Sequence, residues 1–207
     1  MIISFLSQKG GVTKSTLARA TATAFVNGGW ACHIADLDWQ QQTSMKWSTR
    51  RSETKALVEV SVHKRIEPAL KNESLYDVLL VDGRAASDRD AIIVAAKSNL
   101  VVLPTSTTVD DLEPQLNFAN DLRNNGVDAN KLLFIINKAG SMLEVQNTIN
   151  SIRGWGFNVS ENPIEYKTAY AKAQDVGLSL IETKFKTLSL SAEKAVQDII
   201  NKISGGN

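Results

Sequence analysis

Short apolar runs alternate with longer helical patterns along this chain of 207 residues. The runs occupy residues 2–6, 31–35, 57–62, 78–81, 100–103 and 132–136. The last three are rich in leucine and β-branched residues, as expected for strands covered on both faces, whereas the run 57–62 is more polar and is expected nearer an edge of the sheet. Helical patterns occupy residues 15–26, 88–97, 109–124 and 143–154. Such alternation predicts an α/β fold, a doubly wound and mostly parallel sheet with helices on both faces.

Composition narrows the class of protein without identifying it. No linker or low-complexity tract divides the chain, so we expect a single domain over residues 1–207, without an N-terminal helix-turn-helix domain. The 23 cationic and 22 acidic residues give a net charge of +1, which excludes a strongly basic nucleic-acid-binding protein but not a local basic surface. A single cysteine excludes a disulfide framework, and only two histidines, His33 and His63, argue against a histidine-based metal site.

The segment QKGGVTKST, residues 8–16, follows the first apolar run and opens the first helical pattern. Glycines let backbone N–H groups approach an anion closely, and a helix N-terminus behind them adds partial positive charge. Lys14 would reach the terminal phosphates of a nucleotide, and the Ser15 hydroxyl would bind the accompanying Mg²⁺. The predicted nucleotide-binding residues of this loop are Lys9, Gly10, Gly11, Val12, Thr13, Lys14, Ser15 and Thr16.

The loop departs from the common phosphate-loop pattern G-x-x-x-x-G-K-[ST]. Gln8 and Thr13 occupy its two glycine positions, whereas the sequence satisfies K-G-G-x-x-K-[ST], with a second lysine at Lys9. In this respect the chain resembles the ParA/MinD family of deviant Walker ATPases, most closely the small ParA-type plasmid partition proteins. The resemblance implies a deviant P-loop NTPase fold, ATP and Mg²⁺ as cofactors, and ATP hydrolysis with Lys9, Lys14 and Asp38 as catalytic residues.

Acidic residues follow two of the apolar runs. Asp82 ends the run 78–81, where the resemblance implies a Mg²⁺-organising carboxylate, so Ser15 and Asp82 are the predicted metal-binding residues. Asp36-Leu37-Asp38-Trp39-Gln40 resembles the D-x-D-P-Q switch of the family, in which the second acid orients the attacking water. Trp39 stands where the family has proline, which suggests a less rigid switch.

Later segments extend the resemblance over nearly the whole chain. Asp110-Asp111-Leu112 and the stretch 169–179 match further family patterns. Asn137 and Lys138 end the run 132–136, and no aspartate follows at the position that would pair with guanine. Adenine requires only an amide partner, so we expect Asn137 to contact an adenine base.

The resemblance also implies a biological role. Lys9 would cross a two-fold interface to the partner's nucleotide, so that ATP holds a homodimer together and hydrolysis releases it. Proteins of this kind bind DNA non-specifically, work with a small centromere-binding partner that stimulates slow ATP hydrolysis, and are cytoplasmic and nucleoid-associated. Candidate basic clusters are Arg50, Arg51 and Lys55; Lys64 and Arg65; and Lys184, Lys186, Lys194 and Lys202.

Three alternatives remain open. A MinD-like positioning ATPase would serve another cargo through an amphipathic tail, but residues 195–203 lack clustered basic residues and large aromatics, which favours core packing over a membrane anchor. An ATP-dependent ligase or amidating synthase shares the fold and usually lacks an equivalent of Lys9. A non-hydrolysing adaptor would bind nucleotide while Thr13 and Trp39 weaken turnover.

Overall fold

The computed structural model describes residues 1–71, 73–85 and 89–205. The strands are β1 (Ile2–Ser7), β2 (Cys32–Asp36), β3 (Glu59–Val62), β4 (Val78–Ala85), β5 (Leu100–Thr105), β6 (Leu132–Ala139), β7 (Asn158–Val159) and β8 (Ile164–Glu165). The α-helices are α1 (Lys14–Asn27), α2 (Thr43–Thr49), α3 (Ile66–Leu70), α4 (Arg89–Lys97), α5 (Val109–Asn124), α6 (Met142–Gly154), α7 (Thr168–Asp175) and α8 (Lys186–Ile203). Short 3-10 helices are η1 (Glu73–Leu75), η2 (Ala129–Lys131) and η3 (Leu180–Glu182).

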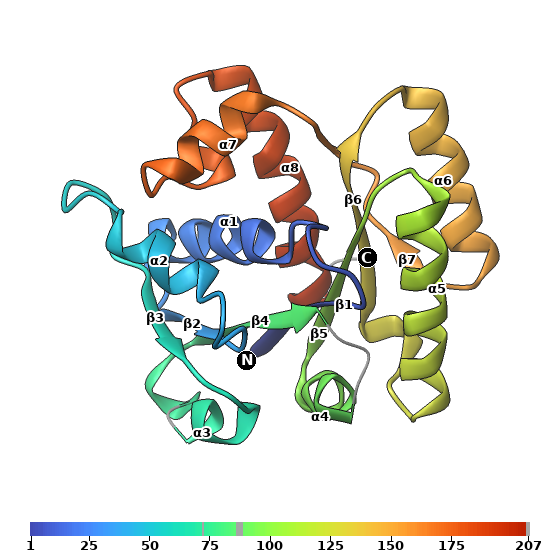
Figure 1. Ribbon diagram of the computed structural model, residues 1–207, viewed down its shortest axis with the longest axis horizontal. Helices are drawn as coiled ribbons and strands as arrows, with labels where there is room; N and C mark the ends of the chain where they lie inside the picture. Colours follow the sequence, from blue (N-terminus) through green and yellow to red (C-terminus); the bar gives the residue numbers. More distant parts are fainter. Residues whose placement is uncertain (72, 86–88, 206–207) are drawn as a thin grey trace.

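The sheet has the strand order β3-β2-β4-β1-β5-β6-β7, with β8 paired to β6 (Figure 1). Every strand pairing among the described residues is parallel. After β1, the chain forms β2, β3 and β4 on one side of that strand and then crosses to the other side, where β5, β6 and β7 lie. Ligands bind beyond the carboxyl ends of strands where such a sheet changes direction, so the loop after β1 lies at the expected place.

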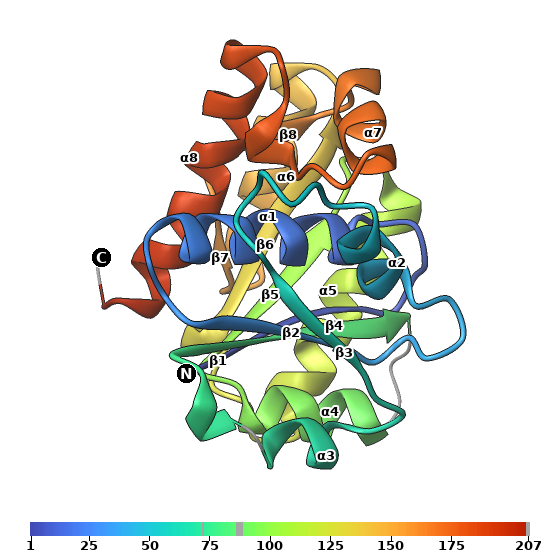
Figure 2. The ribbon, with the colours of Figure 1, turned by 90° about the vertical axis from the view of Figure 1, so that its left-hand side faces the viewer.

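Two hydrophobic cores lie on opposite faces of the sheet. One core packs the sheet against α3, α4, α5 and α6, and the other packs it against α1, α2, α7 and α8 (Figures 1 and 2). Strand residues contribute to the two cores alternately, as Ile2 and Ile3 do on β1. The predicted doubly wound α/β fold is therefore confirmed.

The predicted strands are all present, and the predicted edge position of the most polar run is confirmed, since β3 ends the sheet. Asp88, where the sequence predicts a helix to begin, lies outside the described residues, and α4 begins at Arg89. No element was predicted at α2, where only Ser44 and Trp47 are buried, at α3 and α7, or at the two-residue strands β7 and β8. Elements so short show no measurable hydrophobic period.

Helix α8 buries its apolar stripe against the rest of the molecule. Ala192, Ala195, Val196 and Ile199 belong to the same core as α1, as the core-packing interpretation of this segment expects. Among residues 1–71, 73–85 and 89–205, no helix combines the length and apolar character needed to cross a membrane.

Candidate functional site

The loop between β1 and α1 folds around strained backbone. Gly11 and Thr13 both adopt left-handed conformations, with φ of 76° and 74°. Glycine accepts this region freely, whereas a β-branched threonine is rare there. Thr13 nevertheless starts the helix, because its carbonyl accepts a hydrogen bond from the Leu17 amide at 3.0 Å. Thr13, which replaces the second glycine of the common phosphate-loop pattern, therefore lies at a position whose left-handed backbone conformation favours glycine.

Lys14 is held inside the loop. Its Nζ donates hydrogen bonds to Ser7 Oγ at 2.9 Å and to the Lys9 carbonyl at 3.0 Å. Burial lowers the pKa of this ammonium group, and the nearby carboxylates Asp82 and Asp38 oppose that effect. The side chain is therefore held across the loop, and Lys14 is one of the residues that line the open pocket beside it.

Asp36 and Asp82 lie side by side, because β2 and β4 are neighbours and these residues are register partners. Both are buried, at 0% and 1% exposure. Burial raises the pKa of both carboxyl groups, and for Asp82 the adjacent charge of Asp36 helps to raise it to about 6. A bound cation would stabilise the ionised form of such a pair.

Hydroxyl groups surround these carboxylates. Ser15 Oγ donates to Asp82 Oδ1 at 3.1 Å and lies 2.9 Å from Thr43 Oγ1, while Ser44 Oγ donates to Asp82 Oδ2 at 2.6 Å. Mg²⁺ prefers oxygen ligands and usually takes only one or two from the protein beside phosphate and water. Ser15 and Asp82 thus fit the predicted role in metal binding, and Thr43 supplies a further hydroxyl that the sequence analysis did not select.

Asp36 has a structural role next to the switch. Its Oδ2 accepts hydrogen bonds from the Ser44 and Met45 amides at 2.9 and 3.3 Å, and its Oδ1 accepts one from the Asp38 amide at 3.0 Å. The carboxylate therefore fixes the start of α2 and the backbone of Asp38 together. Asp38, in turn, lines the pocket.

Trp39 and the Lys9 side chain are both partly exposed. Trp39 is 38% exposed, and Lys64 Nζ lies 4.7 Å from its ring centroid, a cation–π contact. The side chain of Lys9 is 43% exposed, and its Nζ lies 3.6 Å from Asp111 Oδ1 on α5. Of the two loop lysines, Lys14 is thus the inward one and Lys9 the outward one.

The predicted site residues largely converge. An open pocket of about 770 Å³ is lined by Gly10, Gly11, Thr13, Lys14, Ser15, Thr16, Arg19, Asp38, Gln41, Thr43, Gly83 and Ala85. Asn137 lines a second pocket that shares Thr13 and Thr16 with the first, which is the arrangement expected of a base beside its phosphates. Lys9 and Val12 do not line the first pocket, and Val12 is buried.

Arg19 is the main residue that the sequence analysis missed. It is 7% exposed, its Nε donates to Ser44 Oγ at 3.2 Å, and Nη1 donates to Gln174 Oε1 on α7 at 2.9 Å. Burial lowers its pKa to about 10, against the opposing effect of Asp82 and Asp36. An arginine on the buried face of the alanine-rich helix α1 was the signal that could have revealed it.

A buried ion pair joins the segment that follows α2 to the 3-10 helix η3, which follows α7. Arg51 donates to both carboxylate oxygens of Glu182 at 2.8 Å, and these side chains are 3% and 8% exposed. Trp47 donates to the Leu178 carbonyl at 3.0 Å in the same contact. Arg51 was a candidate for a DNA-binding surface, and this assignment is wrong because its guanidinium group is committed to Glu182.

Comparison with protein families decides the classification. The family described as AAA domain matches residues 1–139, about two thirds of the chain. The chain belongs to this AAA domain family. Comparison with curated proteins gives no match.

Solved structures support the same fold for this AAA-domain protein. MinD of Pyrococcus horikoshii, complexed with Mg-ADP, is 16% identical with a TM-score of 0.77, covering 99% of this chain and 97% of that one. A Borrelia burgdorferi protein assigned to plasmid partition and bound to AMPPNP is 15% identical with a TM-score of 0.72, covering 97% and 98%. McdA of Cyanothece, in an ATP complex, is 13% identical with a TM-score of 0.69, covering 100% and 96%.

Family and fold together confirm the identification from the loop motif. This AAA-domain protein is a deviant Walker ATPase of the ParA/MinD type. The individual roles predicted for Lys9, Lys14, Asp38, Asp82 and Asn137 rest on the geometry above and stay predictions.

Proposed function

We propose that this protein is a ParA-type ATPase for DNA partition, in which Mg²⁺-ATP assembles a homodimer and hydrolysis releases it. The observation that carries the proposal is the division between the two loop lysines. Lys14 is buried across its own loop, whereas the Lys9 side chain is 43% exposed and its Nζ lies 3.6 Å from Asp111 Oδ1. A lysine so placed is available to a nucleotide held by a second subunit.

Within one subunit, the chemistry needs positioning more than covalent catalysis. Lys14 and the amides of the loop would bind the β- and γ-phosphates, while Ser15 and Asp82 would hold Mg²⁺, which neutralises phosphate charge when bound. Asp38 would orient the attacking water, because it lines the pocket and its backbone is fixed by Asp36. Asn137 would contact adenine in the neighbouring pocket.

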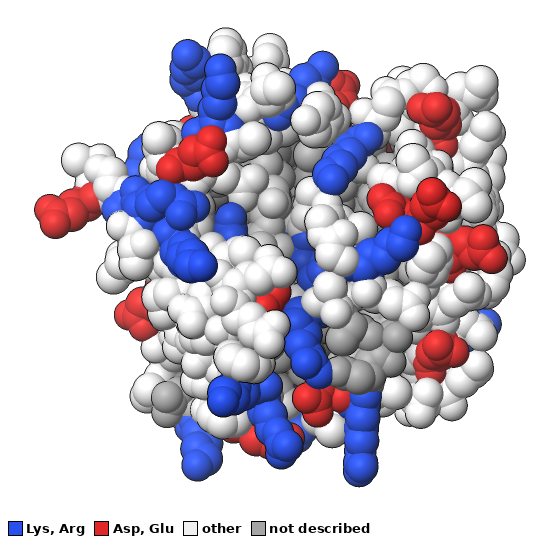
Figure 3. Space-filling model, viewed as in Figure 1, with Lys and Arg blue, Asp and Glu red and all other residues white. Residues whose placement is uncertain are grey.

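Non-specific DNA binding requires a basic surface formed by folding, given the net charge of +1. Lys and Arg side chains gather over the centre and left of the face in Figure 3, while acidic side chains collect on its right, over α5 and α6. The exposed candidates are Arg50, Lys55, Lys64, Arg65, Lys184, Lys186 and Lys194. Such a surface would bind phosphates without reading sequence.

A MinD-like positioning role for another cargo is the second candidate, supported by the MinD structures among the neighbours. The packing of α8 in the core argues against a membrane anchor formed by that helix. The two candidates share the ATPase cycle and differ in the surface that the dimer binds.

ATP turnover, measured with and without non-specific double-stranded DNA at low and high salt, tests the proposal. Partition predicts stimulation by DNA that disappears at high salt, because counterion release weakens phosphate contacts. If ATP turnover does not respond to DNA or to a centromere-binding partner but requires a small carboxylate substrate, the protein is instead a ligase. Turnover stimulated by anionic vesicles would favour the MinD-like role.

Asp38→Ala separates ATP binding from hydrolysis. The variant should bind ATP and accumulate as dimer, because its phosphate and metal ligands remain, while hydrolysis falls by about 10²-fold or more. Size-exclusion chromatography with light scattering and a phosphate-release assay measure the two properties. Normal turnover in this variant would show that Asp38 does not orient the water.

A further inference from the structure

A lysine near the end of β6 is hydrogen-bonded to the phosphate loop, although 127 positions separate the two residues along the chain. Lys138 Nζ donates to the Gly11 carbonyl at 2.8 Å. Lys138 lines the second pocket together with Asn137, whereas Gly11 lines the first pocket, where the phosphates would bind. The contact therefore joins the base side of the site to the phosphate side.

The backbone of β6 is irregular at Lys138. Asn137 is the register partner of Ile164 on β8 and Ala139 is the partner of Glu165, so Lys138 is the additional residue of a β-bulge. Its φ of 53° lies in the left-handed region, which is uncommon for residues other than glycine. Neighbours on a regular strand point to opposite faces, whereas Asn137 and Lys138 line the same pocket. The bulge therefore gives the Lys138 side chain a direction that a regular strand would not.

Gly11, which accepts this hydrogen bond, lies in the part of the loop with left-handed backbone, and its φ is 76°. A peptide unit is planar, so a fixed Gly11 carbonyl also fixes the Val12 N–H, which points the opposite way. Lys138 does not line the phosphate pocket, so the carbonyl oxygen of Gly11 is bonded to a partner outside that pocket. A carbonyl oxygen directed at phosphate oxygens would repel them.

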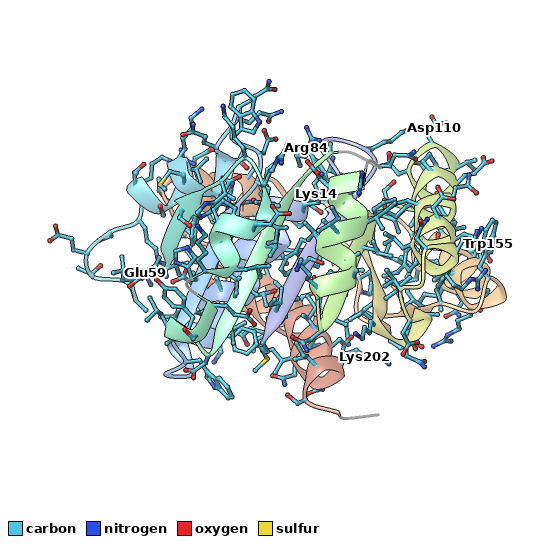
Figure 4. The ribbon with its side chains drawn as sticks, turned by 90° about the horizontal axis from the view of Figure 1, so that it is seen from below. Lys14, Glu59, Arg84, Asp110, Trp155 and Lys202 are labelled. Carbon is cyan, nitrogen blue, oxygen red and sulfur yellow. The ribbon has the colours of Figure 1, made fainter. Side chains whose placement is uncertain are left out.

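Two lysines thus hold the loop by different contacts. Lys14 bonds to Ser7 Oγ and to the Lys9 carbonyl within the loop, and Lys138 reaches the Gly11 carbonyl from β6. Figure 4 shows Lys14 near the middle of the molecule, with Asp110, in the first turn of α5, toward the side on which β6 lies in Figure 1. The loop is therefore fixed both from within and from the β6 side of the sheet.

We propose that Lys138 is a positioning residue of the ATPase, which keeps the Gly11–Val12 peptide unit in the orientation that binds phosphate. This role rests on the proposed binding of ATP phosphates by the loop. Lys138 would act through the backbone of Gly11 and not through the adenine base, although it borders the base pocket. Strained backbone persists where the surrounding structure requires it, and here the strain at Lys138 aims its side chain at the loop.

Competition against a fluorescent ATP analogue, with Mg²⁺ present, measures the affinities of Lys138→Met for ATP and for AMP. Methionine keeps the apolar stem and lacks the ammonium group. ATP affinity should fall about tenfold or more, whereas AMP affinity should change by less than about twofold, because AMP lacks the β- and γ-phosphates. Lys172→Met, which removes an exposed lysine of α7 that lines neither pocket, is the matched control and should leave both affinities unchanged.

Equal losses of ATP and AMP affinity in Lys138→Met would show that Lys138 acts on the base, and an unchanged ATP affinity would show that its bond to Gly11 does not position the loop. Either result overturns the proposal. A wild-type protein that binds no ATP would reject the nucleotide site as a whole, whereas a wild type that binds ATP as tightly as Lys138→Met does would reject only the role of Lys138.

Lys138→Asn separates positioning from backbone strain. Asparagine tolerates the left-handed conformation better than lysine but is too short to reach Gly11, so stability to denaturant should be kept while ATP affinity falls as in Lys138→Met. In the nucleotide-free state, ¹⁵N relaxation should show larger motions of the Gly11 and Val12 amides in both variants than in the wild type. Wild-type ATP affinity in Lys138→Asn, or unchanged loop motion in both variants, would contradict a positioning role.

Discussion

At the residue scale, we expect substitutions of the two loop lysines to affect different steps: ATP binding for Lys14 and dimerisation for Lys9. Lys14→Ala should weaken ATP binding by about 10²-fold, because charge-assisted hydrogen bonds to phosphate contribute up to about 3 kcal/mol. Lys9→Ala should leave ATP binding to the monomer intact while abolishing ATP-dependent dimerisation. Calorimetry and light scattering measure the two effects. A Lys9→Ala protein that dimerises normally with ATP would remove the basis for a contact between subunits.

Asp82 allows a prediction about pH. Its folded pKa of about 6 lies above the ordinary value of 3.8, so the folded state holds the proton longer than the unfolded chain. Stability of the metal-free protein should therefore fall as the pH rises from about 4 to about 6, by roughly 1–3 kcal/mol. Asp82→Asn should be more stable than the wild type at pH 7, and this difference should disappear below about pH 4.

Denaturant unfolding without metal or nucleotide, at several pH values, measures this difference. Added Mg²⁺ should stabilise the wild type but not Asp82→Asn, because the variant has lost the metal-binding carboxylate. A variant less stable than the wild type at pH 7 would show that hydrogen bonds from Ser15 and Ser44 outweigh the cost of burying the charge.

At the element scale, the Arg51–Glu182 pair joins two halves of the site. Helix α2 follows the switch and supplies Ser44 to Asp82, while Gln174 at the end of α7 lines the base pocket and binds Arg19. The ion pair, with Trp47 beneath Arg51, therefore fixes the magnesium side of the nucleotide site against the base side.

Arg51→Leu should destabilise the protein by about 3–5 kcal/mol, because it leaves Glu182 buried without its partner. Arg153→Leu is a matched control, since its partner Glu161 and Arg153 itself are more than half exposed, and the expected loss is about 0–1 kcal/mol. Chemical denaturation compares the two variants. Equal losses would mean that burial does not distinguish the two ion pairs.

At the scale of the whole molecule, the near-neutral charge limits how tightly DNA can be held. A few phosphate contacts would give a log–log slope of binding against salt of about −0.9 for each contact. Reversing two exposed lysines, as in Lys184→Glu with Lys186→Glu, should reduce that slope if they contact DNA. Lys97→Glu, on α4 at the opposite face of the sheet, serves as the control.

Fluorescence anisotropy of a labelled duplex, measured with the ATP-loaded protein over a range of salt concentrations, gives the slopes. A flat salt dependence for the wild type would contradict a DNA-binding role for the dimer. The prediction thus tests the proposed cargo independently of the ATPase chemistry.

The sequence alone determined the features that depend on local order. Alternating apolar runs and helical patterns predict the parallel α/β fold, and glycines with Lys14 between a strand and a helix predict a phosphate-binding loop. These features can be predicted because a strand, a turn and a helix follow one another within a few residues, so spacing fixes their geometry. The metal-binding roles of Ser15 and Asp82 come from the family resemblance and stay predictions.

Only the tertiary structure decided which distant residues meet. The strand order places β2 beside β4, which brings Asp36 against Asp82, and folding of α1, α2 and α7 directs Arg19 to Ser44 and Gln174. Pairing of β2 with β3 likewise unites His33 and His63, two residues that the sequence analysis set aside. Strand order depends on how the two cores pack across the whole sheet, and no local pattern encodes it.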